Sequence, residues 1–181
     1  MIEAIARKIS PLLEVSIVRQ VRRNHALEHA TAHMLARRVP DLRLSGRASD
    51  DGFILICDVP QETMEAAAHE GLERLRAGEG RWAVHPNCGT NLVTLAALTT
   101  GAGVVGLGGN RQLTSDRISF TMLLMIPATM IARPLGMSLQ KHITTKGDPG
   151  DLEIVSVKRH TVKIPFINKQ IVYYRVNTRR G

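Results

Sequence analysis

Apolar and polar residues recur with helix and strand periods over the first half of the chain. A stripe with a period of about 3.6 residues predicts a helix over residues 15–38. Residues 42–58 hold two apolar stretches on either side of the turn signal Asp51-Gly52, which predicts a β-hairpin. A second amphipathic helix is predicted over residues 60–77. The chain is therefore expected to begin with a helix, a hairpin and a second helix.

Two further segments belong to this region. Apolar residues at helical spacing predict a helix over residues 1–13, which Pro11 is expected to bend or break. A helix on a lipid surface and a helix packed on the core fit this pattern equally well. Residues 82–84 have the composition of a third strand. Together these elements predict a compact α+β domain over residues 1–88.

Two long apolar segments follow, with a short polar loop between them. Residues 89–110 contain no charged side chain, and as a helix they would span about 30 Å, the thickness of the hydrocarbon core of a bilayer. Residues 118–139 form the second segment, in which Pro127 interrupts the pattern and Arg133 would have to reach headgroups or protein. The pair predicts a transmembrane hairpin over residues 89–140. A helical hairpin buried in a larger core is the alternative.

Residues 141–181 are predicted to be rich in strands. Three stretches have the composition of short strands, at residues 152–157, 162–167 and 171–176. A tight turn is expected at 168–169. These strands either extend the N-terminal sheet or lie along the membrane surface. The fold class predicted for the whole chain is α+β: a small helix/strand domain, interrupted by a two-helix transmembrane hairpin, with a β-rich C-terminal segment.

The distribution of charge predicts the orientation of the chain in the membrane and the kind of partner that it binds. The formal net charge is +8, and 22 of the 24 Lys and Arg residues lie outside the loop between the two apolar segments. By the positive-inside rule, both termini are expected in the cytoplasm and the hairpin in the cytoplasmic membrane. A basic protein attracts polyanions, and membrane lipids with anionic headgroups are the expected partner. Aromatic residues make up only 3% of the chain, too few for a base-stacking surface, so no nucleic-acid partner is expected.

A candidate metal-binding motif lies in the first long helix. His25-Ala26-Leu27-Glu28-His29 places two histidines four residues apart, on one face of a helix, where both can bind one zinc ion. Glu28 lies beside that face and could act as a general base on a metal-bound water, as in the inverted zincin signature H-x-x-E-H. His33 is a spare ligand or a core neighbour. A helix whose histidines bond only to backbone or carboxylates is the simpler alternative.

A second group of residues that could bind a metal or take part in catalysis lies directly before and at the start of the first apolar segment. Either Cys88 or His85 could complete a tetrahedral zinc site with the two helical histidines, leaving one position for water. Cys88 and His85 could instead be a nucleophile and its base. The simplest interpretation is a tight turn in which Asn87, Thr90 and Asn91 cap the apolar helix. A turn and a ligand are compatible with each other.

Three segments of the chain resemble a known family. They are the run from Arg19 to Thr31, which contains HALEHA, the run AVHPNCGTNL from Ala83 to Leu92, and His142-Ile143-Thr144-Thr145. They resemble a bacterial family of unknown function (domain of unknown function, family 6391) over roughly residues 19–145. The resemblance implies a membrane-associated protein and no established activity.

A weaker, local resemblance is to the pitrilysin-type inverted zincins, at His25, Glu28 and His29. It would imply a hydrolase whose third zinc ligand is a glutamate further along the chain. The candidates for that ligand are Glu62, Glu65, Glu70 and Glu73.

Two hypotheses for the function follow. The first is a membrane-anchored bacterial protein that binds one zinc through His25, His29, His85 and Cys88 and acts without catalysis, in assembling or regulating a larger membrane-protein complex. The alternative is a membrane-surface zinc-dependent hydrolase or peptidase of inverted-zincin type, with Glu28 as the catalytic base. An open coordination position distinguishes a catalytic zinc from a structural one.

Overall fold

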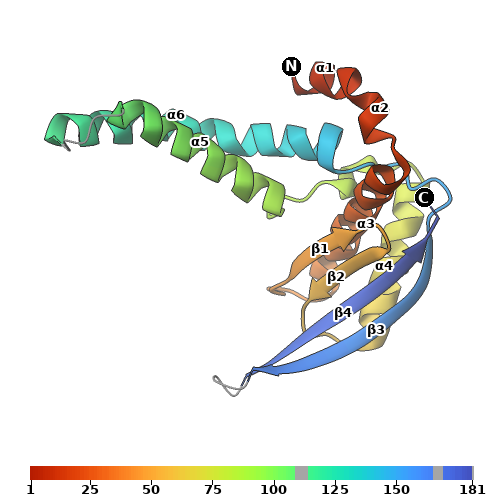
Figure 1. The fold of residues 1–181 in the computed structure, drawn as a ribbon. Helices are drawn as coiled ribbons and strands as arrows, with labels where there is room; N and C mark the ends of the chain where they lie inside the picture. The colour runs from red at the N-terminus through yellow and green to blue at the C-terminus, as the bar shows by residue number, and fades with distance from the viewer. Residues whose placement is uncertain (109–113, 165–168, 181) are drawn as a thin grey trace. The chain divides into compact units, whose positions relative to one another are not determined.

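The chain folds as two units, one of which is inserted in the sequence of the other. A computed structural model describes residues 1–108, 114–164 and 169–180. The first unit comprises Met1–His85 and Lys141–Gly181, and the second comprises Pro86–Gln140. The second unit is therefore the insertion (Figure 1).

The first unit is a four-stranded antiparallel sheet with two long helices on one face (Figure 1). The strand order is β1-β2-β4-β3. In chain order, the helices and strands are α1 (Ile2–Lys8), α2 (Ser10–Leu13), α3 (Ser16–Arg38), β1 (Ser45–Ser49), β2 (Gly52–Ile56), α4 (Gln61–Arg76), the 3₁₀ helix η1 (Gly80–Ala83), β3 (Glu153–Ile164) and β4 (Lys169–Arg179). The predicted α+β class is confirmed, together with the two helices and the first hairpin.

The C-terminal strands extend the N-terminal sheet, which was one of the two alternatives. β4 pairs with β2 over Gly52↔Asn177 to Ile56↔Tyr173, and β3 pairs with the other edge of β4. Tyr174 on β4 is fully buried, and its hydroxyl donates a hydrogen bond to the carbonyl oxygen of Val59 at 2.5 Å. The sheet therefore needs residues from both ends of the chain.

The third strand predicted at residues 82–84 is wrong. Residues 80–83 form the 3₁₀ helix η1 instead, and the position beside β2 is taken by β4. The segment lies along α3 rather than in the sheet, because the carbonyl oxygens of Ala83 and Val84 accept hydrogen bonds from His29 and His33 of α3.

The strands predicted at 152–157 and 162–167 are one strand over the described residues, β3 (Glu153–Ile164). Its middle, residues 158–161, is polar and exposed, and β3 is an edge strand of the sheet. From Thr161 onward, β3 and β4 continue as a two-stranded ribbon beyond the end of β2. Residues 165–168, with the end of the second predicted strand and Asn168 of the predicted turn, lie outside the described residues.

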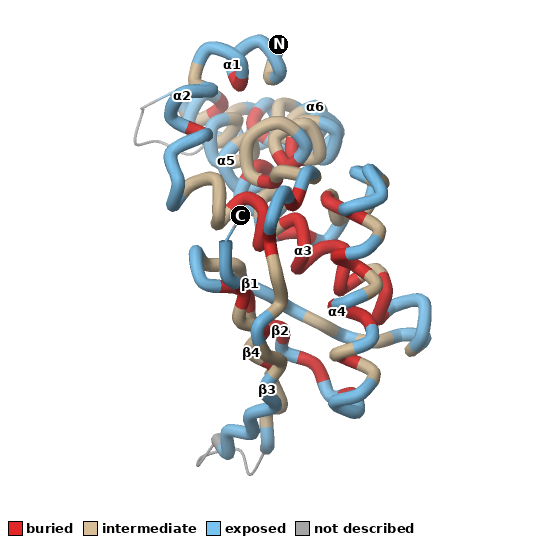
Figure 2. Tube along the Cα trace, turned by 90° about the vertical axis from the view of Figure 1, so that its right-hand side faces the viewer, coloured by how far each residue is buried: buried red, intermediate tan, exposed pale blue. Residues whose placement is uncertain are grey.

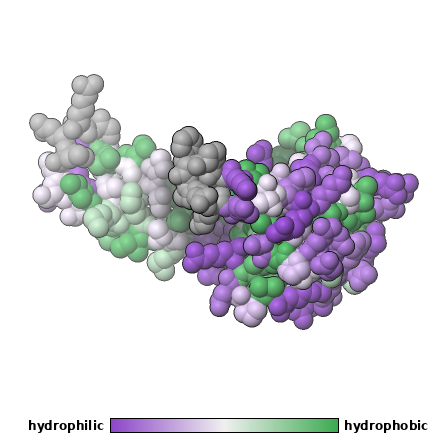
Figure 3. Space-filling model, turned by 90° about the horizontal axis from the view of Figure 1, so that it is seen from below, coloured by the Kyte–Doolittle hydropathy of each residue, from purple (hydrophilic) through white to green (hydrophobic). Residues whose placement is uncertain are grey.

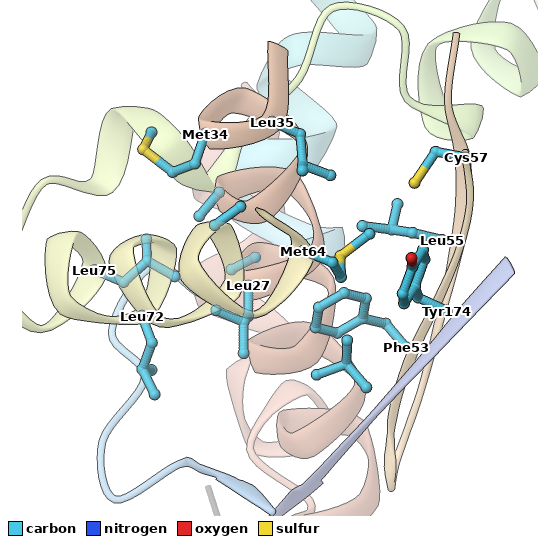
Figure 4. Close-up of a cluster of buried hydrophobic side chains, with 14 of the residues drawn as sticks. Leu27, Met34, Leu35, Phe53, Leu55, Cys57, Met64, Leu72, Leu75 and Tyr174 are labelled. Atoms are coloured by element: carbon cyan, nitrogen blue, oxygen red, sulfur yellow. The ribbon is translucent and has the colours of Figure 1, made fainter. Parts of the chain in front are cut away.

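The core of the first unit fills the space between the sheet and the two long helices. Figure 4 shows the labelled side chains of α3, α4, β2 and β4 pointing toward one another. In Figure 2 the buried residues follow most of the length of α3. The core side chains that are at most 1% exposed include Leu27, Met34, Leu35, Phe53, Leu55, Met64, Leu75 and Tyr174.

A buried polar contact joins α3 to the sheet. Asn24 is fully buried, and its side-chain amide donates to the carbonyl oxygens of Ser49 at 2.8 Å and Asp50 at 3.0 Å. Its side-chain oxygen accepts a hydrogen bond from the hydroxyl of Thr178 at 2.7 Å. One side chain thus fixes the β1–β2 turn and the end of β4 against the helix, and it satisfies polar groups that would be costly to bury alone.

The N-terminal helix is broken as predicted. α1 ends at Lys8 and α2 begins at Ser10, directly before Pro11. Only Ala6 and Leu13 are buried in these two short helices.

The second unit is a hairpin of two long apolar helices, α5 (Gly89–Leu107) and α6 (Ser115–Leu139). A Cβ atom on Gly106 would collide with Thr121, and one on Gly136 would collide with Asn91, so the helices touch at both ends of the hairpin. α6 continues through Pro127 and Pro134, and the chain then forms the short π-helix η2 (Gln140–Thr144). By length and composition, both helices could span a membrane. Figure 3 shows apolar residues over their surface.

Where α3 and α4 cross, the close packing of the two helices requires a small residue at position 71. A Cβ atom there would lie 3.1 Å from the backbone of Ala30 and Thr31, which cannot move without shifting the helix. We expect Gly71→Val to lower the stability of the first unit by about 1–3 kcal/mol, because the larger side chain forces the helices apart. Thermal unfolding in detergent micelles measures this. Gly80→Ala is the matched control, since nothing lies within 4 Å of its Cβ position; equal losses from both variants would contradict this account of the crossing.

Candidate metal centre

α3 presents three histidines along one side, at His25, His29 and His33. The spacing of four residues places successive side chains on one face of the helix. The segment that ends in His85 lies along this face, because the carbonyl oxygens of Ala83 and Val84 accept hydrogen bonds from His29 and His33. His29 is buried, and the other three histidines are half-buried.

The four imidazoles form a row within the first unit. The ring centroids of His25 and His29 lie 4.4 Å apart, and those of His29 and His85 lie 5.9 Å apart. His33 lies on the other side of His85, at 4.7 Å. Two imidazoles that share a tetrahedral zinc at about 2.0–2.1 Å have ring centroids about 5 Å apart. The His25–His29 and His29–His85 spacings lie on either side of that value, and a ligand atom of His25 lies within 4.8 Å of one of His29.

Backbone carbonyl groups set the tautomers of the helical histidines. Nδ1 of His25 lies 3.0 Å from the carbonyl oxygen of Thr144, and Nδ1 of His29 lies 2.8 Å from that of Ala83. A carbonyl oxygen can only accept, so each Nδ1 carries the proton and each Nε2 carries the lone pair that a metal needs. Metal-binding histidines in proteins commonly donate their second ring nitrogen in this way. His33 has the opposite tautomer, because its Nε2 donates to Val84 at 2.9 Å.

His85 is neutral at physiological pH. Burial, assisted by the neighbouring His33, lowers the pKa of its imidazole to about 4. The neutral imidazole is the form that coordinates a metal.

The carbonyl group that fixes His25 belongs to a segment held by two arginines of α3. Arg22 is buried and donates to the carbonyl oxygens of His142, Ile143 and Thr145, at 2.7–3.3 Å. Arg23 donates to that of Asp148 at 3.0 Å. Sequence reasoning did not identify these arginines as part of the site. They stand directly before the histidine motif, but the carbonyl groups that they bond lie about 120 residues further along the chain, and no local pattern connects two such segments.

Glu28 has a different environment from the histidines. It is 7% exposed, and its carboxylate approaches Gly46 of β1 so closely that a Cβ atom there would collide with it. Glu28 therefore packs against the sheet. Its assignment as a catalytic base stays a prediction.

Cys88 begins the second unit's helix hairpin. It is the N-cap residue of α5, and its Sγ accepts a hydrogen bond from the backbone N–H of Thr90 at 3.4 Å. Asn91 donates to the carbonyl oxygen of Pro86 at 2.7 Å, which closes the turn before the helix. The predicted turn is present, and the N-cap residue is Cys88 rather than one of the predicted Asn87, Thr90 and Asn91. Its assignment as a metal ligand stays a prediction.

Cys57 differs from Cys88 in its surroundings. It lies in the core of the first unit, where burial and the neighbouring Asp58 raise the pKa of its thiol to about 11. A thiol of this kind stays protonated and behaves as a small apolar side chain.

Comparison with known proteins gives a family and a relative. Residues 20–157 match a family model described as a domain of unknown function, DUF6391. The chain is also similar to an uncharacterized protein of Picosynechococcus sp., with 33% identity over 155 residues, which cover 78% of this chain and 73% of that protein. No solved structure matches.

The hydrogen bonds of the site predict a pattern of tautomers. In the metal-free protein, at a pH where the imidazoles are neutral, His25 and His29 should carry their proton on Nδ1 and His33 on Nε2. Long-range ¹H–¹⁵N correlation spectra of the histidine rings distinguish the two forms. The exposed His69 on α4 serves as a reference without a fixed tautomer. A spectrum with His29 protonated on Nε2 would contradict the geometry described above.

Proposed function

We propose that this chain, which belongs to the DUF6391 family, is a membrane-anchored protein whose first unit binds one zinc ion in a non-catalytic role. One observation carries the zinc assignment: His25 and His29 stand one helical turn apart with each Nδ1 bonded to a backbone carbonyl oxygen. In this tautomer, Nε2 is the ring nitrogen through which each histidine would bind a common ion.

His85 and Cys88 are the proposed third and fourth ligands. His85 lies in the same row of imidazoles and is neutral at physiological pH. Cys88 follows His85 by three residues, so the covalent chain alone keeps their Cα atoms within about 11 Å of each other. Zinc binds cysteine as the thiolate, and the N-terminus of a helix such as α5 favours a negative charge. Three imidazoles and one thiolate make a four-ligand site that suits zinc.

In the proposed site, protein ligands fill all four coordination positions, which fits a non-catalytic role. Structural zinc sites fill all four positions, whereas catalytic sites keep one for water. The carboxylate of Glu28, which a hydrolase would need beside that water, packs against Gly46 on the sheet side of α3. The proposed role of the zinc is structural, as part of a protein that assembles or regulates a larger membrane complex.

The proposed anchor is the α5–α6 hairpin. Most large apolar side chains that are exposed in the described residues lie on these two helices, among them Leu92, Val104 and Leu123. Only 11% of the apolar window of each helix is buried within the protein, whereas a core helix of a soluble protein would be mostly buried. A bilayer removes such a surface from water. The excess of Lys and Arg outside the α5–α6 loop favours cytoplasmic termini.

We expect purified protein to hold about one zinc ion per chain and the variants His25→Ala and His29→Ala to lose it, because each removes one of the two paired ligands. Cys88→Ser should weaken zinc binding, since the hydroxyl is a poorer ligand than the thiolate. Elemental analysis after dialysis measures the stoichiometry. His69→Ala, an exposed histidine on α4, is the matched control and should keep the ion.

The same preparation distinguishes the two functions. A wild-type protein without zinc, or a His29→Ala variant that keeps it, would remove the proposed site. Glu28→Gln should retain zinc in either case. If the wild-type protein hydrolyses a peptide and Glu28→Gln abolishes turnover while keeping zinc, the hydrolase alternative replaces the non-catalytic role.

The membrane anchor predicts a topology. A fluorescent protein fused after residue 181 should fluoresce, because that end is expected in the cytoplasm. Alkaline phosphatase inserted between α5 and α6 should be active, because a hairpin that crosses the membrane exports this connection. Active phosphatase after residue 181, or a chain that alkaline carbonate extracts from membranes, would contradict the anchor.

A further inference from the structure

Residues 1–19 expose an unusual amount of apolar surface. Their exposed large apolar side chains are Met1, Ile5, Leu12, Val15 and Ile17. Within the described residues of the first unit, only three other large apolar side chains are exposed. Exposed apolar residues gathered in one short segment mark a contact surface, whereas scattered ones need no explanation.

The segment does not contribute to the core of the first unit. The buried apolar cluster between the sheet and the helices contains no residue before Ala26. Ile5 lies on α1 and Leu12 on α2, while Met1 and Val15 are the N-cap residues of α1 and α3. These exposed apolar side chains belong to a broken helix and its connection to α3, and only Ala6 and Leu13 are buried in α1 and α2.

The charges of this segment favour an anionic partner. The carboxylate of Glu14 is bonded to Lys146 at 2.6 Å and lies 3.5 Å from Arg22, and the hydrogen bond from Lys146 lowers its pKa. Glu3 has only a long, exposed ion pair with Arg7, at 3.8 Å. Lys8 is exposed and has no carboxylate partner in the part of the chain that the structure describes. Residues 1–19 thus carry three basic and two acidic side chains, and both carboxylates are paired with basic groups.

We infer that residues 1–19 lie in the headgroup region of an anionic bilayer, with Ile5, Leu12 and Val15 among the upper acyl chains and Arg7 and Lys8 at the phosphates. A short helical segment with apolar and basic side chains binds a membrane surface in this way. The inference rests on the proposed membrane anchor, which would keep the segment close to a bilayer. It decides between the two interpretations of the N-terminal pattern, a lipid-surface helix and a core-packed helix, in favour of the first.

Fluorescence quenching by brominated lipid tests this placement. The full-length protein carries a single tryptophan, Trp82, so Leu12→Trp is made in a Trp82→Phe background. The protein is reconstituted in vesicles of phosphatidylcholine and phosphatidylglycerol, with and without brominated acyl chains. We expect bromination to remove about half of the emission of the Leu12→Trp protein, because interfacial residues reach the acyl boundary. Val155→Trp in the same background is the matched control, a similarly exposed apolar position on β3, and should lose almost none.

The outcomes separate this inference from the anchor. Equal quenching of the Leu12→Trp and Val155→Trp proteins overturns the inference. Emission from Leu12→Trp that is blue-shifted but unaffected by brominated lipid also overturns it, because the segment would then pack on protein, such as a second copy of the chain. Resistance to carbonate extraction is measured on the same variants, so an intact anchor with an unquenched Leu12→Trp rejects only the placement of residues 1–19.

The basic residues provide a second readout. Arg7→Gln combined with Lys8→Gln should reduce the quenching of Leu12→Trp in vesicles that contain phosphatidylglycerol by about twofold or more, because the attraction to anionic headgroups is lost. The pair should have little effect in vesicles of phosphatidylcholine alone. Equal quenching with and without these cations in the anionic vesicles would contradict the electrostatic part of the inference.

Discussion

The pairing of β4 with β2 determines how the two units are arranged along the sequence. Residues 173–177 must align with residues 52–56 to complete the sheet, so the chain has to return to the first unit after the hairpin of α5 and α6. The hairpin is thus an insertion whose two ends belong to one domain. Two spans bring a chain back to the side of the membrane from which it started, so this connectivity is compatible with a transmembrane hairpin, whereas a single span would separate β2 from β4.

Helix α3 makes structural contacts on several of its faces. Leu27 and Leu35 contribute to the core, Asn24 holds the β1–β2 turn and β4, and Arg22 holds the backbone at 142–145. Its histidines bond to two different segments, which the sequence places about 54 and 119 residues away. The row of imidazoles is consequently as rigid as the packing of the helix, and a ligand set built on it would be preorganised by contacts made for stability.

The hydrogen bonds of the histidines bear on the simplest alternative for the H-x-x-E-H motif, a helix whose histidines bond only to the backbone. Those backbone bonds are present for His25 and His29. Each of these bonds uses Nδ1, however, and a bonded Nδ1 orients Nε2 as a metal ligand requires. The backbone contacts are therefore expected in both cases, and they do not distinguish a metal site from the simpler alternative.

Periodicity alone determined the elements with the strongest patterns. It predicted α3, α4, the β1–β2 hairpin and two long apolar helices. Each of these elements has a pattern of apolar residues that can be recognised within its own segment of the sequence. Periodicity failed at Trp82, where a short apolar stretch becomes a 3₁₀ helix along α3. It also failed at residues 158–161, a polar and exposed stretch of the edge strand β3 that divides the apolar pattern of one strand into two. The pair His25 and His29 was readable for the same reason as the helices, since residues four apart share a face. Only the tertiary structure decided three other features: the place of the His85 ring beside His29, the carbonyl groups that set the tautomers, and the arginines that hold residues 142–148. These contacts join segments that no local pattern connects.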